Sequence, residues 1–289
     1  MAEKRIKTNV GAIIPTINSV YESLSPAQKK IADFVLESPS EASELSVSEL
    51  SKVTDSSDAS IIRFCRYIGF DGLKDFKAGL GIEIAKLNFD DSILDTDIEP
   101  SDESSVVAMK LKSRLDNVIS ETINLLNFSE LDKVAECMSQ AKSVAAIGVG
   151  SSGITAAQVK HKFMRIGMNV DAFVDGHNMY MKAALMNQGD VLLGISHSGT
   201  TNELIKSFKI AKESGVTTVA ITHNPRSALA KCADYVLING NRQSQLQGDS
   251  IGTKIAQLFV VDLIYSVLVK TDMTDKMSKK SRTIKVVVK

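Results

Sequence analysis

The fold of the second half of the chain is decided by the stretch Ile195-Ser196-His197-Ser198-Gly199-Thr200-Thr201. This stretch follows the apolar run 191–194, which is typical of a buried strand, and leads into a predicted helix over 202–215. Thr200 and Glu203 have the spacing of a capping box, which marks a helix start. Because the first N–H groups of a helix have no partner within it, and hydroxyl groups surround them here, the stretch indicates a site for a phosphate ester.

A similar turn lies earlier in the chain. The pattern predicts a strand over 143–147, a glycine- and serine-rich turn over 148–153 and a helix over 154–167. We expect the two turns at the carboxyl ends of neighbouring parallel strands, which is the edge where open α/β sheets bind ligands. Glycine and serine also suit any tight turn, so a purely structural interpretation stays open for either turn alone.

The earlier turn also has the spacing G-x-G-x-x-G of a dinucleotide-binding fingerprint, and an acidic residue, Asp175, follows it. This pattern offers an alternative in which the domain binds NAD and Asp175 binds the ribose. The hydroxyl groups of the later turn argue against that alternative, because a dinucleotide fold has no need of them there.

The composition is that of an ordinary globular protein, with 289 residues, 44% hydrophobic and 24% charged, and a formal net charge of zero. It predicts a soluble, cytoplasmic protein of two domains, with no signal peptide and no apolar run of membrane-spanning length. The three cysteines, Cys65, Cys137 and Cys232, have no metal-ligand or redox spacing and are expected to be buried thiols.

A charge run indicates the domain boundary. Residues 90–103 contain Pro100 and a run of Asp and Glu residues, but no basic residue. Such a segment repels itself and favours an extended linker. We therefore expect a first domain over 1–88, an acidic linker over 89–106 and a second domain over 107–289.

The pattern before the linker is helical. Ser25 and Pro26 open a predicted helix, a short helix is predicted over 46–53, and a polar turn over 55–58 leads to a further helix over 59–68. Two short helices across a tight turn are typical of a helix-turn-helix. Residues 1–88 are slightly acidic, which is poor for a DNA-binding domain, although basic residues are in excess over 59–86. From this pattern alone, both a DNA-binding helix and an ordinary core helix stay open.

Residues from about 125 to 270 resemble a sugar isomerase (SIS) domain, a phosphosugar-binding α/β fold. The resemblance rests on the segments 148–152, 165–167, 189–191 and 196–201. In addition, the segments 24–32, 62–73 and 76–77 resemble the RpiR-type transcription regulators, which join an N-terminal helix-turn-helix domain to a SIS domain. The chain departs from that family at Ser56, where a small apolar residue such as valine is usual.

This resemblance implies an all-α helix-turn-helix domain followed by an α/β three-layer domain with a mainly parallel, five-stranded, flavodoxin-like sheet. It also implies that the two turns hold a sugar phosphate, which makes the candidate ligand-binding residues Gly150, Ser151, Ser152, Ser196, His197, Ser198 and Thr201. The helix over 59–68 is expected to enter the major groove. The candidate DNA-binding residues are Ser57, Ser60, Arg63, Arg66, Lys74 and Lys77.

The sequence therefore predicts a DNA-binding transcription regulator whose operator affinity is controlled by a phosphosugar, with no catalytic residue, metal or cofactor. Its partners would be operator DNA, a phosphosugar effector and a second copy in a homodimer or homotetramer, with the apolar helix over 255–269 as a candidate oligomer surface. A sugar-phosphate isomerase is an alternative, as is an NAD-sensing repressor. The isomerase would need a general base, for which the candidates are Glu203, His161, His177, His197 and His223.

Overall fold

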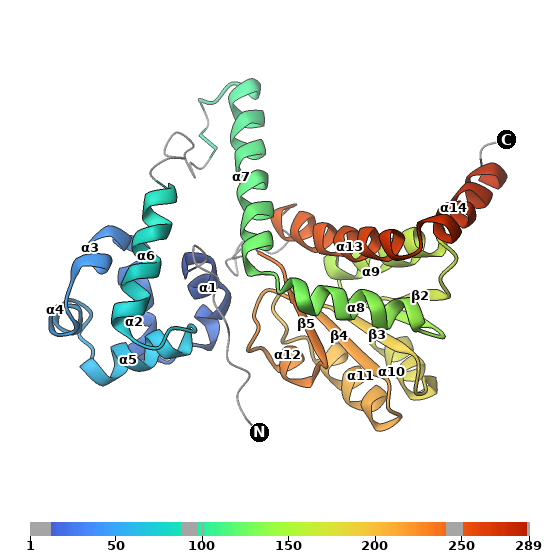
Figure 1. Ribbon diagram of the computed structural model, residues 1–289, viewed down its shortest axis with the longest axis horizontal. Coiled ribbons are helices and arrows are strands. Elements are labelled where there is room, and N and C mark those ends of the chain that lie inside the picture. Colours follow the sequence, from blue (N-terminus) through green and yellow to red (C-terminus); the bar gives the residue numbers. More distant parts are fainter. Residues whose placement is uncertain (1–12, 88–97, 100, 241–250, 288–289) are drawn as a thin grey trace. The chain divides into compact units, whose positions relative to one another are not determined.

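Figure 1 shows the computed structural model of the protein, which describes residues 13–87, 98–99, 101–240 and 251–287. The chain divides into two compact units, residues 1–125 and 126–289. Most of the expected linker over 89–106 lies outside the described residues. Its last residues begin a helix, α7 (Ser104–Leu125), which belongs to the first unit.

The described part of the first unit is helical throughout. Besides α7 it contains α1 (Ile13–Val20), the 3₁₀ turn η1 (Tyr21–Ser23), α2 (Pro26–Glu37), α3 (Pro39–Glu44), α4 (Val47–Val53), α5 (Asp58–Tyr67) and α6 (Leu73–Leu87). Two helix starts follow the sequence closely, because Ser25 and Ser46 each cap a helix through a complete capping box with Gln28 and Glu49. The predicted helix-turn-helix is therefore α4, a short turn and α5.

The core of the first unit is formed mainly by the buried apolar faces of α1, α2, α5 and α6, with smaller contributions from α3 and α4. The face of α5 that contains Ile61, Phe64 and Cys65 is fully buried. Phe64 packs edge to face against Phe76 of α6, with ring centroids 6.2 Å apart. This packing fixes α5 by one side and leaves its other side outward, which is the arrangement that the sequence pattern predicts.

The second unit contains a five-stranded sheet in which every strand pairs in parallel, in the order β2-β1-β3-β4-β5. The strands are β1 (Val144–Ile147), β2 (Val170–Phe173), β3 (Val191–Ile195), β4 (Thr217–Thr222) and β5 (Tyr235–Ile238). β1 and β3 are adjacent, so the loops after them start side by side, and because the strand order reverses between them these loops lead to helices on opposite faces of the sheet. The expected parallel, flavodoxin-like sheet is confirmed.

Helices cover both faces of this sheet and make three layers (Figure 1). One face packs against α8 (Phe128–Gln140), α9 (Ser151–Met164) and α13 (Ile251–Thr271). The other face packs against α10 (Gly176–Leu185), α11 (Asn202–Glu213) and α12 (Ala228–Cys232). A further helix, α14 (Met273–Val287), follows α13 and holds Lys280 over the ring of Tyr265.

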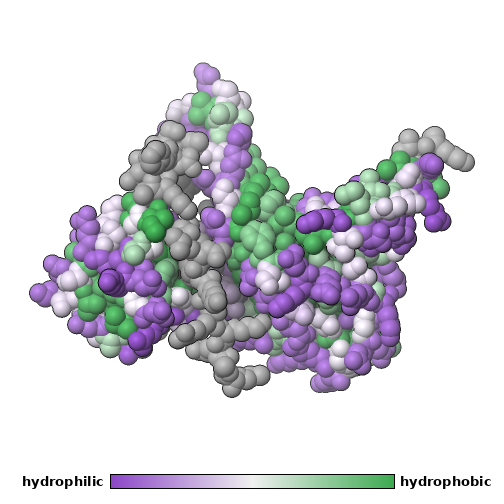
Figure 2. All heavy atoms as spheres, in the orientation of Figure 1, coloured by the Kyte–Doolittle hydropathy of each residue, from purple (hydrophilic) through white to green (hydrophobic). Residues whose placement is uncertain are grey.

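The sequence pattern predicts no apolar run of membrane-spanning length. The helix α13 corrects this expectation, because by length and composition it is apolar enough to cross a membrane. Half of its most apolar window is buried inside the protein, where Val260, Val261 and Ile264 join the core against α8 and α9. These contacts identify α13 as a core helix of the second unit. Figure 2 shows hydrophilic residues over much of the surface of both units, interrupted by hydrophobic areas. Some large apolar side chains are exposed, among them Met109, Ile154 and Leu185.

The three cysteines differ in burial. Cys65 is fully buried, and burial raises the pKa of its thiol to about 12. Cys137 and Cys232 are only half-buried, which corrects the expectation that all three are buried. All three are free thiols.

Candidate functional site

The first turn of the candidate ligand site connects β1 to α9. The helix begins at Ser151, three residues earlier than predicted, because Gly150 has a φ of 60° and turns the chain directly into the helix. Gly148 allows this close approach, since a Cβ there would lie 2.5 Å from the carbonyl oxygen of Ser152. Ser151 and Ser152 are therefore the first two residues of α9, where backbone N–H groups have no partner within the helix.

The side chain of Ser152 is buried and is held by a residue that the sequence analysis missed. Gln257 of α13 donates a hydrogen bond from Nε2 to Ser152 Oγ (3.1 Å) and accepts one at Oε1 from Thr155 Oγ1 (3.0 Å). Its side chain is almost completely buried. Because Gln257 lies far from the turn in the sequence, only its position as a polar residue inside the apolar pattern of 255–269 could have indicated this role.

The second turn connects β3 to α11 and is held by its own hydroxyl groups. Ser196 Oγ lies 2.9 Å from Thr201 Oγ1 and accepts a hydrogen bond from the N–H of Gly199 (3.1 Å). Gly199 has a φ of 64°, and a Cβ there would lie 2.1 Å from Ser227 Oγ. The turn is therefore a closed loop that only glycine allows at its centre.

The predicted capping box of Thr200 and Glu203 is wrong. The residue at the N-cap is Thr201, and its side chain makes no capping hydrogen bond because the hydroxyl is paired with Ser196. Thr200 instead donates from its N–H and its hydroxyl to Ser198 Oγ, at 3.3 Å and 3.0 Å. Ser198 is exposed and accepts both bonds, so its own hydroxyl proton can be donated to a ligand.

His197 lies between the two serines of this turn and is mostly buried. Its ring stacks on the ring of His223, with centroids 5.0 Å apart, and its Nδ1 lies 3.1 Å from the side-chain nitrogen of Asn239. Burial lowers the pKa of His197 to about 3, with a further contribution from the neighbouring His223. The imidazole of His197 is therefore uncharged at neutral pH.

The two turns come together as predicted, because β1 and β3 are adjacent and parallel. The candidate residues Gly150, Ser151 and Ser152 belong to the turn after β1, and Ser196, His197, Ser198 and Thr201 belong to the turn after β3. The site thus combines the starts of two helices, several hydroxyl groups and one neutral imidazole. Such a set donates hydrogen bonds to an anion without presenting a fixed positive charge.

Of the residues that the alternatives rely on, Asp175, His161 and His177 lie on α9 and α10, whereas Glu203 and His223 lie beside the turn after β3. Asp175 is the N-cap of α10 and accepts hydrogen bonds from the backbone N–H (3.0 Å) and the side-chain nitrogen (2.5 Å) of Asn178. These two bonds hold the pKa of Asp175 below its usual range. His161 is exposed near the end of α9, and His177 is exposed in the first turn of α10. Glu203 lies in the first turn of α11, where its Cγ would be 2.8 Å from a Cβ at position 176.

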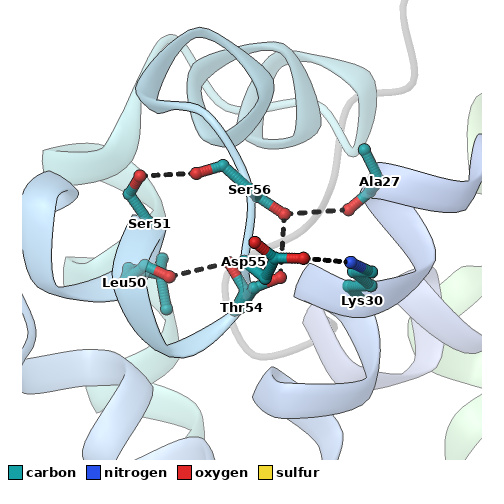
Figure 3. Close-up of polar contacts among 7 residues, drawn as sticks. All are labelled: Ala27, Lys30, Leu50, Ser51, Thr54, Asp55 and Ser56. Atoms are coloured by element: carbon teal, nitrogen blue, oxygen red, sulfur yellow. Dashed lines mark hydrogen bonds and ion pairs between the residues drawn. The ribbon is translucent and has the colours of Figure 1, made fainter.

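In the first unit, the turn of the helix-turn-helix is held by polar contacts (Figure 3). Asp55 has a positive φ of 46° and accepts a hydrogen bond from Lys30 of α2 (2.6 Å). Ser56 Oγ lies 3.1 Å from the carbonyl oxygen of Thr54 and 3.4 Å from that of Ala27, and its single proton can be donated to either. The hydroxyl of Ser56, where the sequence departs from the family that it resembles, therefore has one acceptor in the turn and one in α2.

The six candidate DNA-binding residues are not equivalent. Ser57, Arg63, Arg66 and Lys74 are exposed on or beside α5. Ser60 is buried, and its Oγ accepts a hydrogen bond from Nη2 of Arg63 (3.0 Å). Lys77 is partly buried, and its ammonium donates to the carbonyl oxygens of Glu44 and Leu45 at the end of α3 (2.8 and 3.0 Å). Ser60 and Lys77 are thus held within the unit, whereas Arg63, which donates to Ser60, and Arg66, whose Nε donates to the carbonyl oxygen of Asp71 (3.4 Å), stay exposed.

Comparison with known proteins covers both units. Residues 11–87 match the helix-turn-helix domain of the rpiR family, and residues 137–267 match the SIS domain. An uncharacterized HTH-type transcriptional regulator of Haemophilus influenzae is 50% identical over 96% of this chain and 97% of its own length. The HTH-type transcriptional regulator RpiR of Escherichia coli K12 is 26% identical over 88% of this chain and 84% of its own length.

Solved structures show the same fold. The Vibrio vulnificus NanR protein complexed with ManNAc-6P has a TM-score of 0.62 and 24% identity, and the match covers 96% of this chain and 98% of that one. The sugar isomerase domain of an RpiR transcription factor from Sphaerobacter thermophilus has a TM-score of 0.57 and 19% identity, over 62% of this chain and 98% of that one. Taken with the matched domains and the relatives in sequence, these likenesses lead to one conclusion: the chain belongs to the RpiR family of transcription regulators, with a helix-turn-helix domain followed by a SIS domain.

Proposed function

We propose that this regulator binds a phosphorylated sugar at the turns after β1 and β3, and that the bound sugar changes its affinity for operator DNA. The observation that carries the proposal is the closed turn of Ser196, Gly199 and Thr201 beside the start of α9. The start of α9 offers backbone N–H groups, while the turn leaves the hydroxyl proton of Ser198 and one hydroxyl proton of the Ser196–Thr201 pair to donate. These donors lie at one edge of the sheet and have the chemistry that a dianionic phosphate needs. The NanR protein of similar fold was solved in complex with ManNAc-6P, which supports the same ligand class here.

The site is proposed to bind its ligand without converting it. Aldose–ketose conversion needs a base within hydrogen-bonding reach of a sugar carbon. His197 is a poor base because burial holds its pKa at about 3, and the relatives in sequence are named as transcription regulators. His197 is therefore not proposed as a general base.

For DNA binding, we propose that α5 enters the major groove with Arg63 at its outer face and with Arg66 and Lys74 near the phosphates. The exposure of these three residues supports the assignment. We expect Ser60 to act through Arg63, because its hydroxyl accepts a hydrogen bond from the guanidinium of Arg63. We expect Lys77 to fix α3 against α6. Since helix-turn-helix proteins usually act on two half-sites, a dimer or tetramer is the proposed active form.

The test is calorimetry with ManNAc-6P and a panel of other phosphosugars. Hydrogen bonds to a charged group contribute about 1.5–3 kcal/mol each, so Ser198→Ala with Thr201→Ala should weaken binding by about two orders of magnitude or more. Ser214→Ala, which removes an exposed hydroxyl at the opposite end of α11, is the matched control and should leave the affinity unchanged.

The same samples distinguish a sensor from an enzyme. Spectra recorded by NMR after the titration should contain only the sugar that was added. Unchanged affinity in the double variant would overturn the site, and a growing signal from an isomer would overturn the proposed lack of catalysis.

A further inference from the structure

The ends of β3, β4 and β5 are joined by hydrogen bonds just beyond the sheet. The carbonyl oxygen of His197 accepts from the N–H of His223 (3.0 Å) and from Thr222 Oγ1 (3.1 Å). The carbonyl oxygen of Thr222 in turn accepts from the N–H of Asn239 (3.1 Å). Residues from three separate loops, two of which the sequence analysis did not assign to the site, therefore meet beside the second turn.

The amide group of Asn239 has one orientation that satisfies its neighbours. Its nitrogen Nδ2 donates one proton to the carbonyl oxygen of Gly240 (3.1 Å), which can only accept. The second proton of the same nitrogen faces Nδ1 of His197 at 3.1 Å. If the amide were turned over, its oxygen would face the carbonyl of Gly240, so the carbonyl of Gly240 fixes which end of the amide His197 meets.

This orientation determines where His197 carries its proton. Because Asn239 donates to Nδ1, that nitrogen must have its lone pair available, and the proton of the neutral ring must be on Nε2. His223 is fixed in the opposite tautomer, since its Nδ1 lies 3.0 Å from the carbonyl oxygen of Asn239 and must donate to it. The two stacked rings thus have their protons on different nitrogens, and both assignments depend on Asn239.

Nε2 of His197 makes no hydrogen bond to any other residue that the structure describes, whereas Nδ1 is engaged. His197 is partly exposed and lies between Ser196 and Ser198 in the sequence. Its Nε2–H is therefore a further hydrogen-bond donor in the turn that carries these hydroxyl groups. A neutral N–H donor differs from an imidazolium because it binds an oxygen atom without attracting anions over a distance.

We propose that Asn239 is a positioning residue that makes His197 present an uncharged Nε2–H donor to an oxygen atom of the bound phosphosugar. This inference rests on the proposed function, because it names how the same site recognises its ligand. It adds Asn239, at the end of β5, to the residues that determine specificity, and it gives His197 a defined role as a neutral donor.

The first measurement needs no variant. Nitrogen-15 NMR of histidine-labelled full-length protein reports the tautomer of each imidazole, and the spectrum of His197→Gln identifies the signals of His197 among the four histidines. From about pH 8 to about pH 5, where an ordinary histidine takes up a proton, His197 should stay neutral with its proton on Nε2. A proton on Nδ1, or an imidazolium at the upper end of this range, would overturn the inference.

The second measurement changes the positioning group. Asn239→Asp has nearly the same shape but can only accept, so the proton of His197 should move to Nδ1 and phosphosugar affinity should fall by about tenfold or more. Asn127→Asp makes the same chemical change at the N-cap of α8, where a carboxylate also serves, and is the matched control. Equal affinity in Asn239→Asp and in the wild type, with a shifted tautomer, would overturn the inference.

A third comparison covers the case in which Asn239→Asp does not fold. His197→Gln keeps a neutral N–H donor at the ε position and should retain more affinity than His197→Leu, which has none. Equal losses in both variants would contradict the role of the donor. If the wild type binds no phosphosugar at all, the proposed function fails, while the tautomer in the wild-type spectrum still tests the role of Asn239 separately.

Discussion

Replacing Gly199 by alanine should damage the second turn in two ways that can be separated. A residue with a side chain at a φ of 64° is strained by about 1–2 kcal/mol. In addition, the new Cβ would lie 2.1 Å from Ser227 Oγ and 2.4 Å from Ser227 Cβ, and Ser227 is buried at the start of α12. Forcing such atoms apart costs about 1–3 kcal/mol, so Gly199→Ala should lose about 2–5 kcal/mol of unfolding free energy.

Gly215 provides the matched control because it has a similar φ of 72° at the end of α11, but its nearest neighbour, Gln188 Cβ, would be 3.7 Å from a new Cβ. Gly215→Ala therefore carries the backbone strain without the clash. Urea unfolding of both variants should give a larger loss for Gly199→Ala, and only that variant should lose phosphosugar binding. Equal losses in the two variants would refute the argument that the packing against Ser227 closes this turn.

Two further predictions concern DNA binding and pH. Arg63→Ala should cost roughly 1–3 kcal/mol on the operator, whereas Lys74→Ala should weaken binding to all sequences and lower the salt slope by about one, as fluorescence anisotropy at several salt concentrations would measure. If neither variant weakened DNA binding, the assignment of α5 as the helix that contacts DNA would be wrong. The second prediction concerns pH. His197 takes up a proton near pH 6.5 in the unfolded state but only near pH 3 in the folded state, so the free energy of unfolding should fall as the pH drops through this window. This group contributes at most about 1.4 kcal/mol per pH unit to that fall. Urea unfolding at several pH values should show a smaller acid loss in His197→Gln, and an equal loss would contradict the burial of a neutral imidazole.

Local signals in the sequence predicted the features that depend on neighbouring residues. Ser25 with Gln28 and Ser46 with Glu49 start helices because each pair satisfies its own backbone N–H groups, whatever the rest of the chain does. The parallel sheet was predictable for a similar reason, since short apolar runs alternate with helices throughout the second unit. The resemblance to a known family then indicated which turns matter.

The features that the sequence did not reveal depend on residues distant along the chain. Thr200 and Glu203 have the right spacing for a capping box, but the hydroxyl of Thr201 is held by Ser196 and the helix starts one residue later than the box requires. Gln257 and Asn239 reach the site from α13 and β5, and no motif in their own segments marks them. In the same way, the burial of Ser60 follows from the packing of its helix and not from its sequence.

The reversal of strand order between β1 and β3 has a mechanical consequence. The helix α9 leaves its turn on one face of the sheet and α11 leaves its turn on the other face, so the two helix starts belong to different layers. A ligand whose phosphate bonds to both turns would therefore be bound to both helical layers at once. Any movement of one helical layer relative to the other would then stretch the hydrogen bonds to the ligand. Binding of one small molecule would thus make the three-layer domain stiffer.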